Sequence, residues 1–150
     1  MKLVVPPPFV AFVAAAGMWG LDQSLPVFQI EFGVQRETAI LVAGLGFLID
    51  MRSMFGFFAA KTTIDPVRPD ATSSLVTDGL YRFSRNPMYI GLALMLTGWM
   101  IWLGQPVNLL LLAVFIWFVT EFQIKPEEAV LREKFGEAYE AYCARVRRWV

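Results

Sequence analysis

The 150-residue chain contains no histidine and a single cysteine, Cys143. Without histidine there can be no Ser-His or Cys-His catalytic pair, no imidazole metal ligand and no imidazole proton shuttle. One cysteine excludes an internal disulfide framework and a zinc site built from several thiolates. Any chemistry must therefore use carboxylates, arginines, tyrosines, the backbone or a cofactor's own reactivity, and we expect no bound metal.

Charge is also scarce, because charged residues make up 17% of the sequence and the formal net charge is zero. A zero net charge gives no indication of a nucleic-acid partner. Hydrophobic residues make up 57%, against roughly 45–50% in a typical soluble domain. This composition predicts an integral membrane protein, and the length predicts a single domain over residues 1–150.

Four apolar stretches are candidates for membrane spans, each of which needs about 20 mostly apolar residues. They cover residues 6–21, 38–60, 88–103 and 107–124. The short connection between the last two, GQP at residues 104–106, predicts an antiparallel helical hairpin. The predicted fold is therefore all-α, a polytopic membrane protein with about four transmembrane helices.

Basic residues are concentrated on one side of the predicted spans. That side has Lys2, Lys61, Arg68, Arg82, Arg85, Lys125, Arg132, Lys134, Arg145, Arg147 and Arg148. The opposite side has only Arg36. The positive-inside rule therefore predicts that both termini and the loop between the second and third spans are cytoplasmic. We expect the protein in a bacterial inner membrane.

Residues 126–146, after the fourth span, have the pattern of an amphipathic helix. Pro126 suits the first helical position, and Glu127 and Glu128 complement the positive end of the helix dipole. Apolar residues recur at spacings of three or four, namely Leu131, Phe135, Ala138, Tyr142 and Val146. This helix is too charged to cross the membrane, so it should lie on the surface or fold back over the spans.

The predicted hairpin returns the chain to the membrane face from which it started. The start of the third span and the end of the fourth should therefore be neighbours, with Arg85 and Asn86 near Glu127 and Glu128. Each pair also has a plain structural interpretation. The first would be the interfacial start of a helix, and the second a solvated first turn favoured by the helix dipole.

Two motifs resemble the isoprenylcysteine carboxyl methyltransferase and phospholipid methyltransferase superfamily. The first is Gly79, Leu80 and Tyr81 followed by RNPMYIG at residues 85–91. The second is PEE at residues 126–128, followed by Leu131, Phe135, Gly136, Tyr139, Tyr142 and VRRW at residues 146–149. The loop at residues 61–79 also looks like the one that precedes the first motif in short bacterial members. The first two spans match only in hydrophobic pattern.

This resemblance implies an all-helical membrane enzyme that uses S-adenosylmethionine and takes a lipophilic acceptor from the bilayer. The cofactor would lie between the cytoplasmic ends of the last spans and the carboxy-terminal helix. By motif, its site would consist of Tyr81, Arg85, Asn86, Pro87, Tyr89, Gly91, Glu127 and Glu128. The catalytic residues would be Arg85, Asn86 and Glu128.

Methyl transfer from a sulfonium needs positioning more than acid–base groups, which fits the residue inventory. We expect Arg85 to hold the cofactor carboxylate, and Glu127 or Glu128 to accept from its ammonium or ribose. Tyrosine faces would flank the adenine or the cationic sulfur, and Gly91 would allow the backbone or the cofactor to approach closely.

Asn86 stands where many superfamily members have histidine, and an amide cannot titrate near neutral pH. An acceptor that is already anionic or basic is therefore favoured. A prenylated cysteine carboxylate, a phospholipid amine, a small thiol and a quinone-like lipid all remain open. We expect no obligate protein partner.

Three further features have open interpretations. Asp50 and Arg52 lie within the second predicted span, where function and local packing are equally good explanations. Glu121 is expected to point into the same cavity as the motif residues. Trp149 and the neighbouring arginines are expected to be interfacial anchors.

Two other functions compete with methyl transfer. A membrane reductase of the steroid-reductase type, dependent on NADPH, shares an Arg-x-Pro-x-Tyr motif. That group tends to have an acidic residue after the glycine, whereas Leu92 follows Gly91 here. A small non-enzymatic membrane scaffold is the other alternative.

Overall fold

The computed structural model describes residues 5–25, 29–59 and 75–150, with the backbone alone for residues 57–59. The described residues form helices and no β-strand, which confirms the all-α prediction. In chain order the elements are α1 (Pro7–Ser24), α2 (Gln35–Ala59), the 3-10 turn η2 (Gly79–Arg82), α3 (Pro87–Leu103), α4 (Asn108–Val119), the π-helical segment η3 (Thr120–Ile124), α5 (Lys125–Phe135) and α6 (Glu137–Arg145). Most of the predicted loop at residues 61–79 lies outside the described residues.

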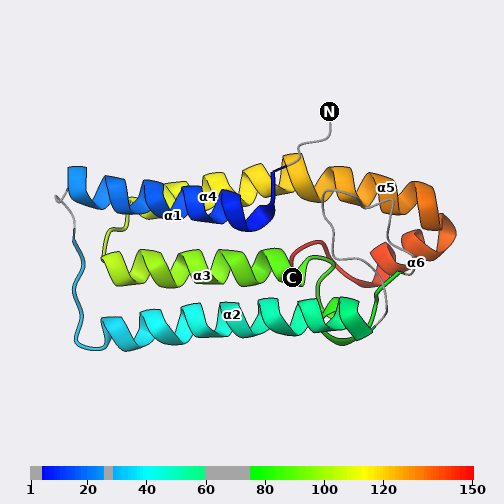
Figure 1. Ribbon diagram of the computed structural model, residues 1–150, viewed down its shortest axis with the longest axis horizontal. Coiled ribbons are helices and arrows are strands. Elements are labelled where there is room, and N and C mark those ends of the chain that lie inside the picture. Colours follow the sequence, from blue (N-terminus) through cyan, green and yellow to red (C-terminus); the bar gives the residue numbers. More distant parts are fainter. Residues whose placement is uncertain (1–4, 26–28, 60–74) are drawn as a thin grey trace.

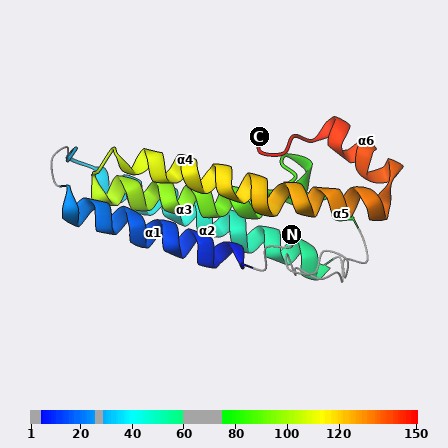
Figure 2. The same ribbon diagram turned by 90° about the horizontal axis from the view of Figure 1, so that it is seen from above.

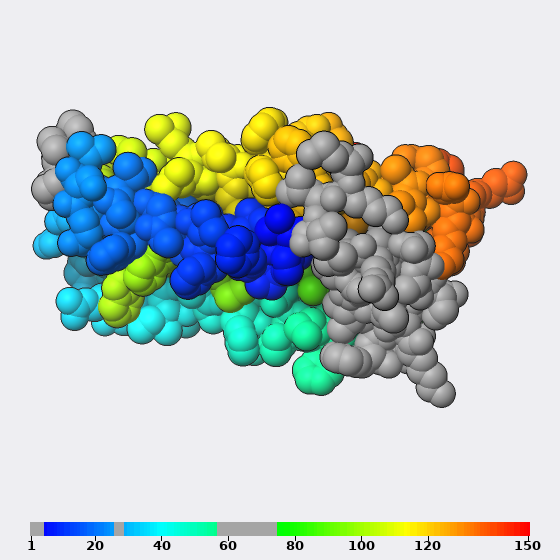
Figure 3. Space-filling model, turned by 45° about the horizontal axis from the view of Figure 1, so that its top comes forward, coloured from blue at the N-terminus to red at the C-terminus, as the bar shows by residue number. Residues whose placement is uncertain are grey.

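Helix α3 is the central element of the bundle. It contacts α1, α2 and α4, and it lies between α2 on one side and the layer of α1 and α4 on the other (Figure 1). Helix α5 continues α4 beyond the end of the bundle, and α6 turns away from it (Figure 2). The molecule is therefore elongated, with α5 extending past the end of α1 (Figure 3).

The turn between α3 and α4 has the geometry that the GQP sequence predicts. Gly104 adopts the left-handed conformation (φ 68°), which ends α3 and which glycine tolerates without steric cost. Its N–H donates to the carbonyls of Met100 and Ile101, and its carbonyl accepts from the N–H of Ile30 (2.7 Å). The predicted hairpin is confirmed, and it returns the chain to the end of the bundle where α3 begins.

Helices α2 and α3 pack with their backbones in contact. A Cβ atom on Gly46 would lie 2.6 Å from the carbonyl oxygen of Gly91, and one on Gly98 would lie 2.7 Å from that of Ala39. Small residues at helix interfaces allow this approach in membrane proteins. The face of α2 turned away from α3 presents large apolar side chains, including Ile40, Leu41, Phe47, Leu48 and Phe55.

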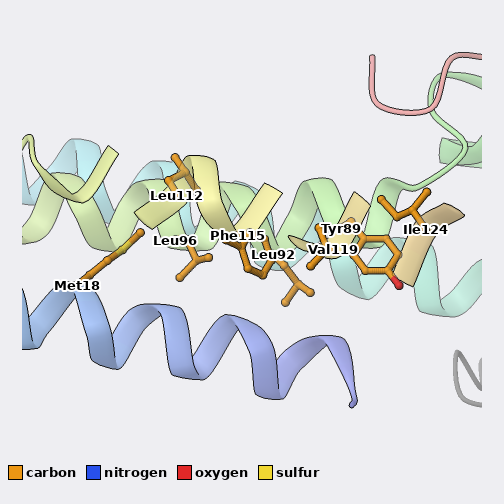
Figure 4. Packing of buried hydrophobic residues seen from close by; sticks show 8 residues of the cluster. All are labelled: Met18, Tyr89, Leu92, Leu96, Leu112, Phe115, Val119 and Ile124. Atoms are coloured by element: carbon orange, nitrogen blue, oxygen red, sulfur yellow. The ribbon is translucent and has the colours of Figure 1, made fainter. Parts of the chain in front are cut away.

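A core cluster of buried side chains connects α1, α3 and α4. It consists of Met18, Tyr89, Leu92, Leu96, Leu112, Phe115, Val119 and Ile124. Tyr89 and Ile124 lie at one end of this cluster (Figure 4). The end of the apolar core therefore lies at the first motif, which contains Tyr89, and next to the second motif, which begins two residues after Ile124.

The π-helical segment η3 changes which face of the helix points inward. Buried positions in α4 follow helical spacing at Leu112, Phe115 and Val119, but the next buried apolar residue is Ile124, five positions later. The extra residue rotates α5 by about 100° relative to an uninterrupted α-helix. A proline ring also clashes with the carbonyl four residues earlier in an α-helix, so the wider turn accommodates Pro126.

The structure differs from the prediction of one amphipathic helix over residues 126–146. The chain instead forms α5 and α6, separated by Gly136 at φ 50° and ψ −124°. The positive φ of Gly136, which glycine adopts readily, interrupts the helical hydrogen bonds and turns the chain. After α6, Val146 is extended and the chain runs back towards the start of α3 (Figure 1).

Two helices are long and apolar enough to cross a membrane by length and composition, Gln35–Gly56 and Asn108–Phe135. Pro87–Leu103 is a shorter apolar helix. In the longer continuous helix Glu121 is the first charged residue, and charged residues become frequent from Lys125 onward. Helix α5 therefore extends beyond the part that a bilayer would accommodate.

Candidate active site

The two motifs meet at the end of the bundle where α3 starts. Arg85, between η2 and α3, pairs with Glu128 of α5, with Nη2 3.3 Å from Oε1. Their side chains are 13% and 7% exposed, so this is a largely buried ion pair. The predicted proximity of these two stretches is confirmed.

Glu128 has a second arginine partner that the sequence interpretation missed. Arg148 donates from Nε to Oε1 (3.0 Å) and from Nη2 to Oε2 (2.7 Å), which is a bidentate pair. We call Arg85, Glu128 and Arg148 the ion triad. Arg148 was expected to be an interfacial anchor, and this expectation is wrong because the turn at Gly136 brings the tail back to α5.

The tail is fastened to the start of α3 by its backbone. The carbonyl of Arg148 accepts from Asn86 Nδ2 (3.0 Å) and from Ser84 Oγ (3.2 Å). The carbonyl of Arg147 accepts from the N–H of Arg85 (2.9 Å). Trp149 packs against the core cluster rather than standing free. Asn86 therefore holds the tail, and Pro87 follows it as the first residue of α3.

Arg85 is only partly satisfied by these contacts. Its Nη1 donates to the Sγ of Cys143, and its Nη2 faces Glu128. Its Nε is buried and has no hydrogen-bond partner. Because a buried donor without an acceptor is costly, Arg85 is suited to receive a further oxygen ligand.

Glu127, the neighbour of Glu128, has different surroundings. Its Oε1 accepts a hydrogen bond from the Tyr89 hydroxyl (3.0 Å), and it makes no ion pair with any described residue. Burial raises the pKa of Glu127 to about 7, although the hydrogen bond from Tyr89 lowers it. Glu127 is thus a carboxylate beside the triad without a cation to neutralise it.

Three tyrosines of η2 and α6 lie near the ion triad and Glu127. The hydroxyl of Tyr142 in α6 donates to the carbonyl of Tyr81 in η2 (2.7 Å), which ties these elements together. Tyr139 and Tyr142 pack with Val146 in a second buried cluster. Burial raises the pKa of the Tyr81, Tyr139 and Tyr142 hydroxyls, so all three are protonated at neutral pH.

The remaining predicted residues have mainly packing surroundings. Gly91 faces α2, where a Cβ atom would lie 2.7 Å from the carbonyl oxygen of Gly46, so its close approach is to a helix backbone. The guanidinium of Arg52 lies over Gly79 in η2, within 3.7 to 3.9 Å of a Cβ built there. Glu121 pairs with Lys125 one turn later on an accessible part of the helix.

No three of the Cys, Asp and Glu side chains in the described residues are grouped so that they could hold a metal ion. The chemistry of this site is instead that of a cluster of mixed charge. Two arginines face one carboxylate, and a second carboxylate stands alone beside tyrosines. Such an arrangement suits a ligand that carries an anionic and a cationic group.

Comparison with known proteins identifies the family. The family model described as phospholipid methyltransferase matches residues 34–138. The chain belongs to this family. The match covers more than two thirds of the sequence and includes the first motif and the first part of the second, so the predicted superfamily is confirmed. No solved structure matches the chain at a significant level.

Several curated proteins are similar to this family member. Protein-S-isoprenylcysteine O-methyltransferase of Schizosaccharomyces pombe is 39% identical over 123 residues, 81% of this chain and 52% of that protein. Protein-S-isoprenylcysteine O-methyltransferase B of Arabidopsis thaliana is 30% identical over 113 residues, 75% of this chain and 50% of that protein. The chain thus spans about half the length of these methyltransferases.

A shorter relative matches over its whole length. An uncharacterized protein of Haemophilus influenzae is 43% identical over 63 residues, which is 42% of this chain and 100% of that protein. Its name carries no activity, so the methyltransferase relatives are the ones that bear on function. Family membership and the two apolar helices together indicate a membrane protein.

Proposed function

We propose that this chain is an integral membrane methyltransferase that transfers a methyl group from S-adenosylmethionine to a lipophilic or membrane-partitioned acceptor. The observation that carries the proposal is the junction of the two motifs. Arg85 of the first motif pairs with Glu128 of the second, and Glu127 lies beside them without a cation among the described residues. Homologues named as methyltransferases support the same reaction class.

The residues present fit the charged groups of S-adenosylmethionine. Arg85 has a buried Nε without a partner and is proposed to hold the carboxylate of the cofactor. Glu127 is proposed to accept from its ammonium or its ribose hydroxyls. Both oxygens of Glu128 are already occupied by the triad, so we assign Glu128 to positioning Arg85 and Arg148 rather than to the cofactor.

When bound, the cofactor supplies a methyl group on a sulfonium sulfur, which keeps the bonding electrons as the acceptor takes the methyl group. The chain's part is to hold the two reactants in line and to exclude water. Asn86 is proposed to maintain the tail over the site through Arg148, since its amide already donates there. Tyr81 and Tyr89 would present aromatic faces to the cationic centre.

The acceptor favoured by the relatives' names is the carboxylate of an S-isoprenylcysteine. A carboxylate is already anionic, so its methylation releases no proton and needs no general base. This agrees with a site that has no histidine. A lipid amine and a thiol are the alternative acceptors.

The membrane arrangement is proposed from charge and helix length. The proposal has four spans, with the site and both termini at the cytoplasmic face, because the basic residues gather at that end. Helix α1 has 18 residues and exposes Phe9, Phe12 and Trp19, and α3 has 17. An inner-membrane location follows the same assignment.

The radiolabel experiment for this proposal uses purified protein in detergent and S-adenosylmethionine labelled in the methyl group. We expect label in an N-acylated S-farnesylcysteine, or in phosphatidylethanolamine or a small thiol, and we expect Arg85→Ala to abolish the transfer. Transfer to none of these by the wild-type protein would contradict the proposal. An NADPH-dependent reduction would instead support the reductase alternative. If the protein showed neither activity, the non-enzymatic scaffold would be the alternative that remains.

A further inference from the structure

Gln123, in the π-helical segment η3, has an amide oxygen without a hydrogen bond. The side chain is buried, with the residue 6% exposed, and its Nε2 donates to the carbonyl of Val5 at the start of α1 (2.8 Å). Its Oε1 has no partner in the part of the chain that the structure describes. The carbonyl of Val5 can only accept, so it fixes which end of the amide is the oxygen.

The position of Gln123 relates this oxygen to the candidate active site. Gln123 lies four residues before Glu127, so the two side chains lie on the same side of the helix about one turn apart. The preceding inward residue is the apolar Val119, and the adjacent Ile124 belongs to the core cluster beside Tyr89 (Figure 4). At this end of the bundle, Gln123 is therefore a buried polar side chain beside the apolar core.

Because of this position, the oxygen would meet the reactant that comes from the bilayer side. The charged groups of the triad lie further from the core than Glu127, on α5 and the tail. The amide oxygen of Gln123 is neutral, so it accepts hydrogen bonds from N–H or O–H groups and does not bind a carboxylate. Its ligand is therefore a hydrogen-bond donor on an otherwise apolar molecule.

We propose that Gln123 binds the methyl acceptor, with Oε1 accepting a hydrogen bond from an N–H or O–H group next to the methylated atom. This inference rests on the proposed methyltransferase function. Two acceptor sources present that group, the amide N–H of an acylated S-prenylcysteine and the headgroup N–H of an aminolipid. Gln123 thus selects acceptors that carry a donor close to the reacting atom.

Gln105 provides a matched control at the other end of α4. It is 1% exposed, its Nε2 donates to the carbonyl of Leu25 after the end of α1, and its Oε1 also lacks a partner. Both glutamines therefore fasten α1 to the α4 helix, and Gln105 does so far from the site. A purely structural role would make Gln123→Met and Gln105→Met equivalent.

The experiment measures KM and kcat for wild type, Gln123→Met and Gln105→Met with N-acetyl-S-farnesylcysteine and with its ester analogue, in which oxygen replaces the amide N–H. We expect Gln123→Met to raise KM for the amide about tenfold and to leave KM for S-adenosylmethionine unchanged. The wild type should lose a similar factor on the ester, and Gln123→Met should not distinguish the two acceptors. Gln105→Met should behave as wild type, with thermal stability similar to that of Gln123→Met.

The second arm uses vesicles containing phosphatidylethanolamine, for which only Gln123→Met should raise KM if the aminolipid is the acceptor. Equal effects of Gln123→Met on amide and ester acceptors, or equal KM effects of the two glutamine variants, would overturn the inference. So would a wild type that binds S-adenosylhomocysteine but methylates neither acceptor, although the cofactor site would then stand. Absence of S-adenosylhomocysteine binding would instead overturn the proposed function.

Discussion

Glu127 and Glu128 are adjacent in the sequence, yet they differ in what neutralises them. Glu128 faces two arginine side chains, whereas Glu127 has only the hydroxyl of Tyr89. Breaking a buried ion pair lowers stability, because it leaves a buried charge without a partner. A buried carboxylate that already lacks a cation lowers stability for the same reason. The two carboxylates should therefore respond in opposite ways to the same substitution.

We expect Glu128→Gln to lower the free energy of unfolding by about 2–3 kcal/mol, because Arg85 and Arg148 lose their shared counter-charge. Glu127→Gln should raise stability at pH 8 and leave it unchanged near pH 4. The folded-state pKa of about 7 lies above the usual 4.5, so wild-type stability falls as pH rises between these values. Chemical denaturation in detergent at both pH values measures this, and a stabilised Glu128→Gln would contradict the account.

The sequence predicted that Arg85 and Glu128 are neighbours, but it did not predict that Arg148, which also belongs to the second motif, pairs with Glu128. Arg85 precedes the first helix of the hairpin and Glu128 follows the second. Because the turn between the helices is short, connectivity alone places the two residues near each other. Arg148 reaches Glu128 only after a turn at Gly136 and an extended tail. Such a return depends on tertiary packing, which local patterns do not report.

The π-helical segment η3 sets the direction in which the side chains of Glu127 and Glu128 point. Val119, Gln123 and Ile124 are all buried, and the helix that continues from η3 turns Glu127 towards Tyr89 and Glu128 towards Arg85 and Arg148. The sequence carried one indirect signal, Pro126, which an uninterrupted α-helix would not accommodate there. The hydrophobic pattern predicted that one helix ends at Ile124 and another begins at Pro126. It did not predict a continuous helix with one inserted residue.

Deleting Phe122 tests this role of η3. We expect the deletion to restore α-helical spacing, to rotate α5 by about 100° and to abolish S-adenosylhomocysteine binding. Phe122→Ala is the control, because it removes the exposed ring that contacts Trp117 and Phe118 and keeps the chain length. Circular dichroism should show unchanged helix content in both variants. Retained binding in the deletion variant would show that η3 does not orient the site.

The interface between α2 and α3 makes a separate prediction for stability. Gly46→Ala should destabilise the bundle by about 1–3 kcal/mol, because its Cβ would lie 2.6 Å from the carbonyl oxygen of Gly91. Gly44→Ala is the matched control in the same helix, since no atom lies within 4 Å of its added Cβ. Thermal unfolding compares the two, and equal midpoints would contradict backbone contact at Gly46.

The whole molecule has two chemically distinct ends. At one end lie the ion triad and the tail, and at the other the α1–α2 connection meets Gly104. A bilayer around the bundle would separate these ends, and in the proposed orientation the triad end, where basic residues are in excess, faces the cytoplasm. The positions of the apolar stretches could be predicted from the hydrophobic pattern of the sequence. The depth of each helix in a membrane depends on how the helices pack, which that pattern does not report.

Cysteine labelling tests the proposed orientation in a Cys143→Ala background. Gly33→Cys lies in the α1–α2 connection with open space around it, and Val150→Cys is an exposed terminal position. We expect a membrane-impermeant maleimide to label Gly33→Cys in intact bacterial cells and Val150→Cys only after permeabilisation. The opposite pattern would overturn the proposed orientation, and labelling of both in intact cells would overturn the four-span arrangement.

The central claim is that the meeting point of the two motifs binds S-adenosylmethionine, and calorimetric titration with S-adenosylhomocysteine tests it most directly. The account predicts one site per chain, no binding of NADPH, and an affinity that decreases as pH falls from 8 to 6 while Glu127 gains its proton. Glu127→Gln should bind at least tenfold more weakly and lose this pH dependence. Absence of binding by the wild type, or equal affinity in Glu127→Gln at every pH, would contradict the assignment.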